Sequence, residues 1–154
     1  MNLFIQQVDL PQLTLAYTIA TSYKEAHARI KKYLTAGEKN IRDAKIYHAE
    51  IRTMQSRVVF LYTEAVDFFT DFEKSEIQLI AVEAGPYLTV KIEKVLYQKM
   101  LEDDKITQEQ FSKEIDDYCR LHNVSMHMPA FPYLAYTSDG KEQIYFPIKK
   151  NKAV

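Results

Sequence analysis

The sequence has few of the residues that form cross-links and phosphate-binding loops. Its 154 residues include one cysteine, three glycines and no tryptophan. A lone cysteine excludes an internal disulfide, and three glycines leave little room for loops that cradle phosphate groups. The sequence has no P-loop, no Rossmann glycine pattern and no G-x-S-x-G nucleophile elbow. We therefore expect neither a disulfide framework nor a nucleotide site, and we assign no catalytic residue.

The sequence also lacks a strong charge of either sign and long apolar runs. The formal net charge is −1, so bulk charge provides no attraction to nucleic acid. No apolar run approaches the roughly 20 residues of a membrane helix, and the N-terminus lacks the pattern of a signal peptide. We expect a cytoplasmic protein without a membrane partner or a direct nucleic-acid partner.

One group of residues has the side-chain types that bind zinc. Cys119 and His122 are spaced C-x2-H, and His127 lies five residues further on. Zinc sites need three or four ligands from defined turns, and no fourth ligand is apparent here. We therefore expect no metal and no cofactor.

Two stretches with the same pattern occur, one in each half of the chain. Val8–Tyr17 and Val82–Ile92 each contain a valine, an acid, a turn with proline and then the order Leu-Thr-aliphatic. In the second stretch, Leu88, Val90 and Ile92 alternate with residues that point the other way. This period of two predicts a half-buried strand in each copy, preceded by a break at the proline.

A helix is predicted after each of these strands. Ser22–Glu25 forms a capping box, apolar residues follow at helical spacing, and Gly37 offers a stop signal. Thr107–Gln110 forms a second capping box, and Glu93–Asp103 predicts an additional helical piece before it. Each strand is therefore followed by a helix.

Two further strands close each half. The pairs are Lys45–Thr53 with Arg57–Thr63, and Phe131–Thr137 with Gln143–Ile148. The second pair is separated by a turn that contains Asp139-Gly140, a strong hairpin signal. The order strand-helix-strand-strand thus occurs twice. It predicts an α+β fold of two pseudo-equivalent halves with an antiparallel sheet and a cleft between them.

We predict one domain over residues 1–154, with halves at about 1–63 and 77–150 joined by a linker at 64–76. The linker carries three aromatic residues, Phe68, Phe69 and Phe72, at helical spacing among acids. These rings either cover the core or are presented to a protein partner. Both alternatives remain open at the level of the sequence.

Tyrosine is the conspicuous residue type, with eleven copies beside eight phenylalanines. In the last strand, Ile144, Phe146 and Ile148 form one face, which leaves Tyr145 on the other. Such a tyrosine either covers the sheet surface, where it is a good strand former, or lines a cleft. In a cleft its ring would stack on a ligand, including a cationic one held by ring faces and a carboxylate. The candidate ligand-binding residues are Tyr17, Tyr47, Tyr133, Tyr136, Tyr145 and Glu83.

Three segments resemble the GyrI-like effector-binding domains. Glu142–Lys149 resembles the closing strand of that family, Val82–Val90 its central strand, and Val8–Leu15 with Ser22–Glu25 its opening strand and helix. The resemblance implies two strand-helix-strand-strand units around a cleft for small aromatic or cationic molecules. It also implies a stand-alone form, because the chain begins at the first strand without a helix-turn-helix. Some members of the family hydrolyse cyclopropane-bearing genotoxins.

The sequence departs from the family at one functional position. The resemblance places the family's cation-binding or catalytic glutamate near residues 131–136, and none of these is acidic. Gln143 matches the family's acid before the last strand, with Glu142 one step out of register, and only Tyr145 matches a ligand-contacting aromatic. Glu83 could substitute for the missing carboxylate, although its counterpart Asp9 suggests a simpler role at a strand end.

Three hypotheses about function follow. The first is a sensor or sequestering protein for a small aromatic molecule or hydrophobic cation. The second is a non-enzymatic interaction module, a homodimer or an accessory to another protein, that uses the aromatic linker or an exposed strand edge. The third is a hydrolase that works through Glu83 or Glu142 and a tyrosine. We favour the first.

Overall fold

The structure, a computed structural model, describes residues 1–53, 55–66, 76–127 and 134–151. Within these ranges it contains three α-helices, one short 3-10 helix and nine strands, whose described pairings are antiparallel. This confirms the predicted α+β class. None of the helices in this part of the chain has the length and hydrophobicity needed to cross a lipid bilayer. The linker residues Phe68, Phe69 and Phe72 lie outside the described residues.

The chain divides into two compact units. Unit 1 consists of Met1–Pro11 and Ala84–Val154, and unit 2 consists of Gln12–Glu83. These bounds differ from the halves expected at about 1–63 and 77–150, because the first strand belongs with the second half of the sequence. The physical reason is strand pairing, which is described below for each unit.

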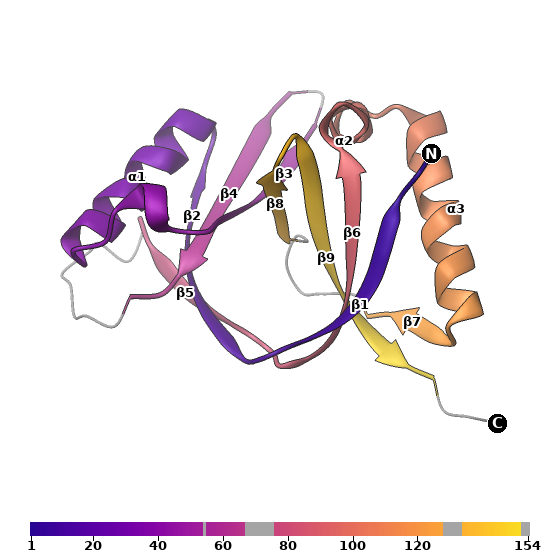
Figure 1. Cartoon of the computed structure of the whole chain (residues 1–154). Coiled ribbons are helices and arrows are strands. Elements are labelled where there is room, and N and C mark those ends of the chain that lie inside the picture. The colour runs from indigo at the N-terminus through magenta and orange to yellow at the C-terminus, as the bar shows by residue number, and fades with distance from the viewer. Residues whose placement is uncertain (54, 67–75, 128–133, 152–154) are drawn as a thin grey trace. The chain divides into compact units, whose positions relative to one another are not determined.

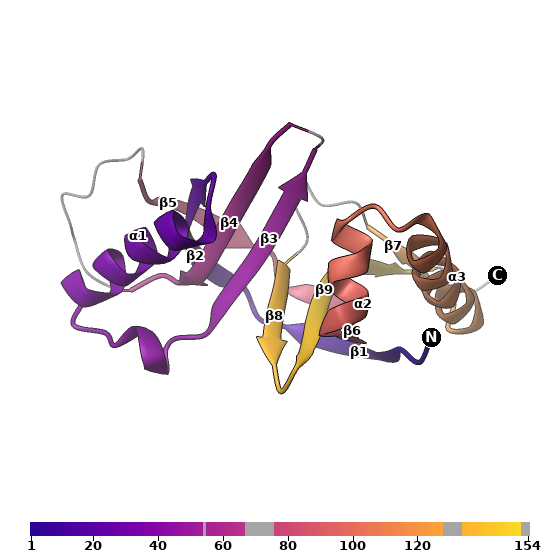
Figure 2. The same ribbon diagram turned by 90° about the horizontal axis from the view of Figure 1, so that it is seen from above.

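Unit 2 consists of a four-stranded sheet and one long helix (Figure 1). In chain order its elements are β2 (Leu13–Ala20), α1 (Tyr23–Ala36), η1 (Ile41–Asp43), β3 (Ile46–Arg52), β4 (Arg57–Glu64) and β5 (Gln78–Val82). The strand order is β5-β2-β4-β3. Figure 2 shows β3 and β4 side by side as the hairpin that the sequence predicts.

Helix α1 begins and ends where the sequence predicts. The side chain of Ser22 accepts a hydrogen bond of 3.2 Å from the backbone N–H of Glu25. At the other end, the backbone N–H of Gly37 donates to carbonyl groups of the last turn. The buried face of the helix, which includes Ile30, packs on the face of the sheet that carries Leu61.

Unit 1 consists of five antiparallel strands and two helices (Figure 1). In chain order its elements are β1 (Phe4–Leu10), β6 (Gly85–Glu93), α2 (Lys94–Leu101), α3 (Lys105–Leu121), β7 (Val124–Met126), β8 (Leu134–Ser138) and β9 (Lys141–Lys150). The strand order is β1-β6-β9-β8, and β7 pairs with the C-terminal end of β9. The predicted helical piece after β6 is confirmed as α2.

The predicted N-terminus of α3 is wrong by three residues, which is nearly one helical turn. Asp104, not Thr107, is the N-cap: its carboxylate accepts a hydrogen bond of 3.1 Å from the backbone N–H of Thr107. Thr107 is itself buried in the first turn. Aspartate caps a helix at least as well as threonine, so the helix extends back to the earlier residue.

The two units have the same strand order, although unit 1 includes β1 from the start of the chain and unit 2 is one continuous segment. β1, β6, β9 and β8 of unit 1 correspond in order to β5, β2, β4 and β3 of unit 2. The repeated stretches found in the sequence contain the two points at which the chain passes between units, after Pro11 and after Glu83. The sequence predicts the strands β2 and β6 that follow these points. It does not predict β1 and β5, which precede them, or the short β7.

Candidate functional site

Three tyrosines of unit 2 lie next to one another across the sheet. Tyr17 of β2 and Tyr47 of β3 are both directly opposite Tyr62 of β4 in the strand register. Residues opposite each other in an antiparallel sheet share a face, and the neighbouring Leu61 packs against α1. The three tyrosines, which we call the tyrosine row, therefore lie on the face opposite the helix.

Contacts with its neighbours fix the centre of the tyrosine row. The rings of Tyr17 and Tyr62 have centroids 5.4 Å apart, and Phe60 stacks on Tyr62 with centroids 6.3 Å apart and an interplanar angle of 9°. The Tyr17 hydroxyl donates a hydrogen bond of 2.6 Å to Oε1 of Gln78 on β5. Offset aromatic pairs of this kind add to the stability gained by burial. The row is thus a constrained part of the sheet.

Tyr62 is almost completely removed from solvent. Its side chain is 1% exposed. Burial, and secondarily the phenol of Tyr17, raises the pKa of Tyr62 far above its ordinary value. Desolvation disfavours the phenolate, so the ring remains neutral. A ligand could contact the row only at its more accessible members, Tyr17 and Tyr47, which are half-buried.

A pocket of about 760 Å³ lies within unit 2, and Tyr47 forms part of its wall. The end of α1, the segment around η1, the first residues of β2 and β3, and the end of β4 surround it. The apolar part of the lining is Leu13, Leu15, Leu34, Ala44, Ala65 and Val66. Small-molecule sites are typically concave and mostly apolar, with a volume of roughly 300–1,000 Å³. We call this cavity the Tyr47 pocket.

The charged residues of the Tyr47 pocket are mixed in sign. Glu38, Asp43 and Glu64 contribute carboxylates, and Lys39 and Lys45 contribute ammonium groups. All five residues are exposed. The ammonium nitrogen of Lys45 lies 5.1 Å from the centroid of the Tyr47 ring. This distance falls within the range of a cation–π contact.

Two of the predicted tyrosines belong to unit 1. Tyr145 of β9 lies on the face opposite the helices, as predicted, because the adjacent Ile144 and Phe146 are buried in the core that contains α3. Tyr136 of β8 is opposite Gln143, two residues from Tyr145 on the same face. Both tyrosines are half-buried. The structure therefore brings Tyr136 and Tyr145 to one face in unit 1, and Tyr17 and Tyr47 to one face in unit 2.

The remaining predicted residues are placed differently. Tyr133 lies outside the described residues. Glu83 is exposed in the segment between β5 and β6 and does not line the Tyr47 pocket. Glu142, the other acid considered for hydrolysis, is 1% exposed and lies on the helix-covered face. One of its oxygens accepts a hydrogen bond of 2.6 Å from the hydroxyl of Thr137.

Three residues of this site, Phe60, Tyr62 and Lys45, are not among the candidates predicted from the sequence. Tyr62 and Phe60 follow Val58-Val59 in a continuous apolar run, where alternation between faces is not visible. Lys45 stands two residues before Tyr47, a spacing that places both side chains on one side of an extended segment. The lysine could therefore have been found from its spacing, whereas the register that places Tyr62 between two other tyrosines could not.

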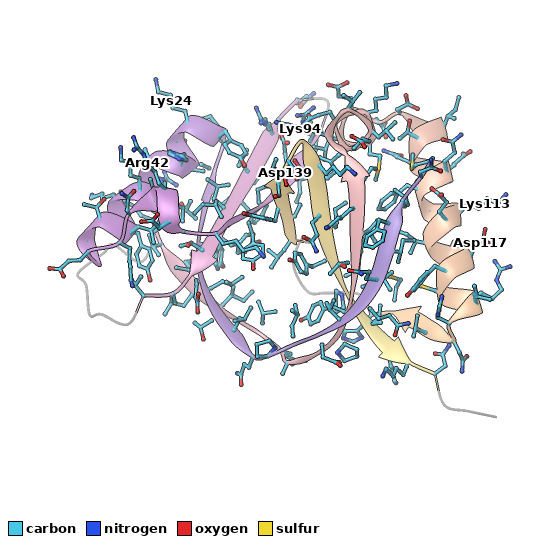
Figure 3. All side chains as sticks on the ribbon, viewed as in Figure 1. Lys24, Arg42, Lys94, Lys113, Asp117 and Asp139 are labelled. Carbon is cyan, nitrogen blue, oxygen red and sulfur yellow. The ribbon has the colours of Figure 1, made fainter. Side chains whose placement is uncertain are left out.

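Other features offer weaker sites. Among the described residues, no three histidine, cysteine, aspartate or glutamate side chains lie close enough together to hold a metal ion. Cys119 is buried, and the His122 ring stacks on Tyr118 with centroids 4.0 Å apart. A second hollow follows the outer side of α3, where Figure 3 shows Lys113 and Asp117 pointing away from the sheet. All the residues that line this hollow belong to α3. They form the solvated polar face of an amphipathic helix.

No protein-family model matches the sequence, and no curated protein matches it. The fold does match solved structures. A hydrolase from Listeria innocua has a TM-score of 0.63 at 11% sequence identity, covering 94% of this chain and 91% of that chain. An uncharacterized conserved protein from the same species has a TM-score of 0.60 at 10% identity, covering 94% and 92%. The C-terminal domain of EcmrR has a TM-score of 0.53 at 11% identity, covering 97% and 99%.

These similarities extend over nearly the whole chain. At such low identity they show a shared fold and nothing about the ligand or the reaction.

Proposed function

We propose that this chain is a GyrI-like small-molecule-binding domain and that its ligand occupies the Tyr47 pocket. The observation that carries the proposal is a cavity of about 760 Å³ whose lining combines six aliphatic residues and Tyr47 with polar and charged residues. A cavity of this size can enclose most of a drug-sized molecule. The aliphatic wall would bind the apolar body of the ligand, and Tyr47 would stack on an aromatic group.

The proposed ligand class is an aromatic molecule or a hydrophobic cation. Apolar burial supplies most of the binding free energy for such molecules, at roughly 25 cal/mol per Å² removed from water. Glu38, Asp43 and Glu64 outnumber the two lysines of the pocket, so the summed charge of its lining is negative. The protein would act as a sensor or as a sequestering protein.

The structural neighbours show the fold of this chain and do not identify its function. The C-terminal domain of EcmrR and this chain share a fold over nearly their full lengths. A Listeria innocua neighbour is described as a hydrolase. In this chain, however, neither acid considered for hydrolysis, Glu83 or Glu142, lines the Tyr47 pocket. Binding without catalysis is therefore the function that the described residues support best.

A thermal-shift screen with aromatic compounds and hydrophobic cations tests the proposal. A ligand present at 100 times its Kd stabilises the folded state by about 2.7 kcal/mol. For a chain of this length that corresponds to an increase in Tm of roughly 5–10 °C. Tyr47→Leu should reduce the shift, because the ring that stacks on the ligand is lost.

Tyr136→Leu is the matched control. It removes a half-buried tyrosine from a strand of unit 1, outside the Tyr47 pocket. The shift should survive in this variant. The absence of a shift for every compound would refute the proposed function, and equal loss of the shift in both variants would refute the assignment to the Tyr47 pocket.

A further inference from the structure

We propose that Lys45 sets the charge selectivity of the Tyr47 pocket by placing its own ammonium group where a cationic ligand would bind. The inference rests on the proposed function and specifies which ligands the pocket takes. With Lys45 present, the pocket favours neutral aromatic molecules over cations of the same shape. Without Lys45, the pocket accepts the cations.

The first support is the position of the ammonium group. The Lys45 nitrogen lies 5.1 Å from the centroid of the Tyr47 ring, and both residues line the same cavity. The negative electrostatic potential of an aromatic face attracts a cation within about 6 Å of its centroid. One face of the Tyr47 ring therefore already has a cation over it, supplied by the chain itself.

The second support is the geometry of the strands. Lys45 immediately precedes β3 and is separated from Tyr47 by one residue, so both side chains project from the same side of the extended backbone. Ile46 is opposite Thr63 in the register, and continuing that register by one residue places Lys45 beside Glu64. The lysine thus has its ammonium group near an aromatic face and stands opposite an acidic residue in the register, and a ligand cation would use groups of these two kinds.

The consequence for a ligand depends on its charge. A neutral aromatic molecule can pack against the aliphatic residues and stack on Tyr47 without meeting a like charge. A cation must displace the Lys45 ammonium group or bind close to a like charge, and either requirement weakens its affinity. The acidic residues of the pocket attract the ligand cation and the Lys45 ammonium group alike, so they do not remove the competition between the two.

Lys39 provides a matched control for Lys45. It lines the same cavity and carries the same charge, and it is also exposed. No cation–π contact of Lys39 is found among the described residues. Lys39→Met and Lys45→Met therefore remove the same charge from the pocket, but only the second substitution removes the ammonium group that lies over the ring of Tyr47.

The test uses two probes of nearly equal shape. Acridine is neutral at mildly alkaline pH, and N-methylacridinium is a permanent cation. Their Kd values are measured by fluorescence titration with the wild-type chain, Lys39→Met, Lys45→Met and the double variant Lys45→Met/Tyr47→Leu. Thermal unfolding of each variant establishes that it is folded, and Lys45→Gln is the replacement if Lys45→Met is not.

We expect Lys45→Met to increase the affinity for N-methylacridinium relative to acridine by about three- to five-fold. Lys39→Met should give a smaller increase, and the double variant should lose the additional gain. The inference is overturned if the affinity for N-methylacridinium relative to acridine is unchanged in Lys45→Met, or if this ratio is the same in the two single variants. Binding of acridine in that case leaves the proposed function intact. If neither probe nor any compound of the screen binds the wild-type chain or Lys45→Met, both proposals fail.

Discussion

Replacing Tyr62 by phenylalanine tests whether the centre of the tyrosine row is as dry as the structure shows. Tyr62 is 1% exposed, and burial is the main cause that raises its pKa far above the ordinary value. In the unfolded chain the phenol titrates near pH 10. Between these two pKa values the unfolded state has lost the proton and the folded state retains it.

The direction and size of the effect follow from proton linkage. Above pH 10 the unfolded state binds fewer protons than the folded state, so the stability contributed by neutral Tyr62 is complete below pH 10 and is lost as the pH rises. A phenol that ionises in the unfolded state but not in the folded state lowers the free energy of unfolding by about 1.4 kcal/mol at pH 11. This corresponds to a decrease in Tm of roughly 3–5 °C. Tyr62→Phe should not show that decrease.

The assay is thermal unfolding of the wild type and Tyr62→Phe at several pH values from 9 to 11. Tyr23→Phe is the control, because water reaches the Tyr23 ring, which is 41% exposed, in the folded chain as well as the unfolded chain. It should retain the wild-type slope. If the Tm of Tyr62→Phe falls with pH in parallel with the wild type, the phenol is hydrated in the folded state and our description of the row is wrong.

Two further predictions concern unit 1. Leu88→Ala should destabilise the protein by about 2–5 kcal/mol in urea denaturation, because Leu88 is completely buried and the substitution leaves a cavity; Leu121→Ala, at a position 80% exposed, should change stability little. Burial and the negative charge of Asp116 raise the pKa of the Cys119 thiol, so iodoacetamide should alkylate it at least about ten-fold more slowly in the folded chain than in urea; equal rates would contradict the described burial.

Most features of the fold that depend on local sequence were predicted correctly, the N-cap of α3 being the exception. The alternation of Leu88, Val90 and Ile92 identifies one face of β6, and the structure confirms it, since all three are buried in one core. The side chains of Tyr145 and Phe146 point to opposite faces of β9, which follows from the same period of two. Capping of α1 by Ser22 is equally local, because the cap and its partner are three residues apart.

Features that depend on pairing between distant segments were not predicted. Phe4–Leu10 has weak alternation, and its classification as a strand depends on β6, whose partner residues are about eighty positions away. The same holds for β5, which pairs with β2. The site shows the same limit: the sequence identifies Tyr17 and Tyr47 separately, but only the register of β4 places Tyr62 between them.

The tyrosine row also explains why Tyr47, rather than its neighbours, is the ring on which ligand selection should depend. Tyr62 has almost no exposed surface, and the hydroxyl of Tyr17 is engaged by Gln78. Only Tyr47 belongs to the row and also lines the pocket. Tyr47 is paired in the register with Tyr62, whose ring is buried and packed. The backbone at Tyr47 is therefore held in place before a ligand binds, which lowers the entropy lost on binding. A single residue beside it, Lys45, can therefore change which charge the pocket accepts without any change in the fold.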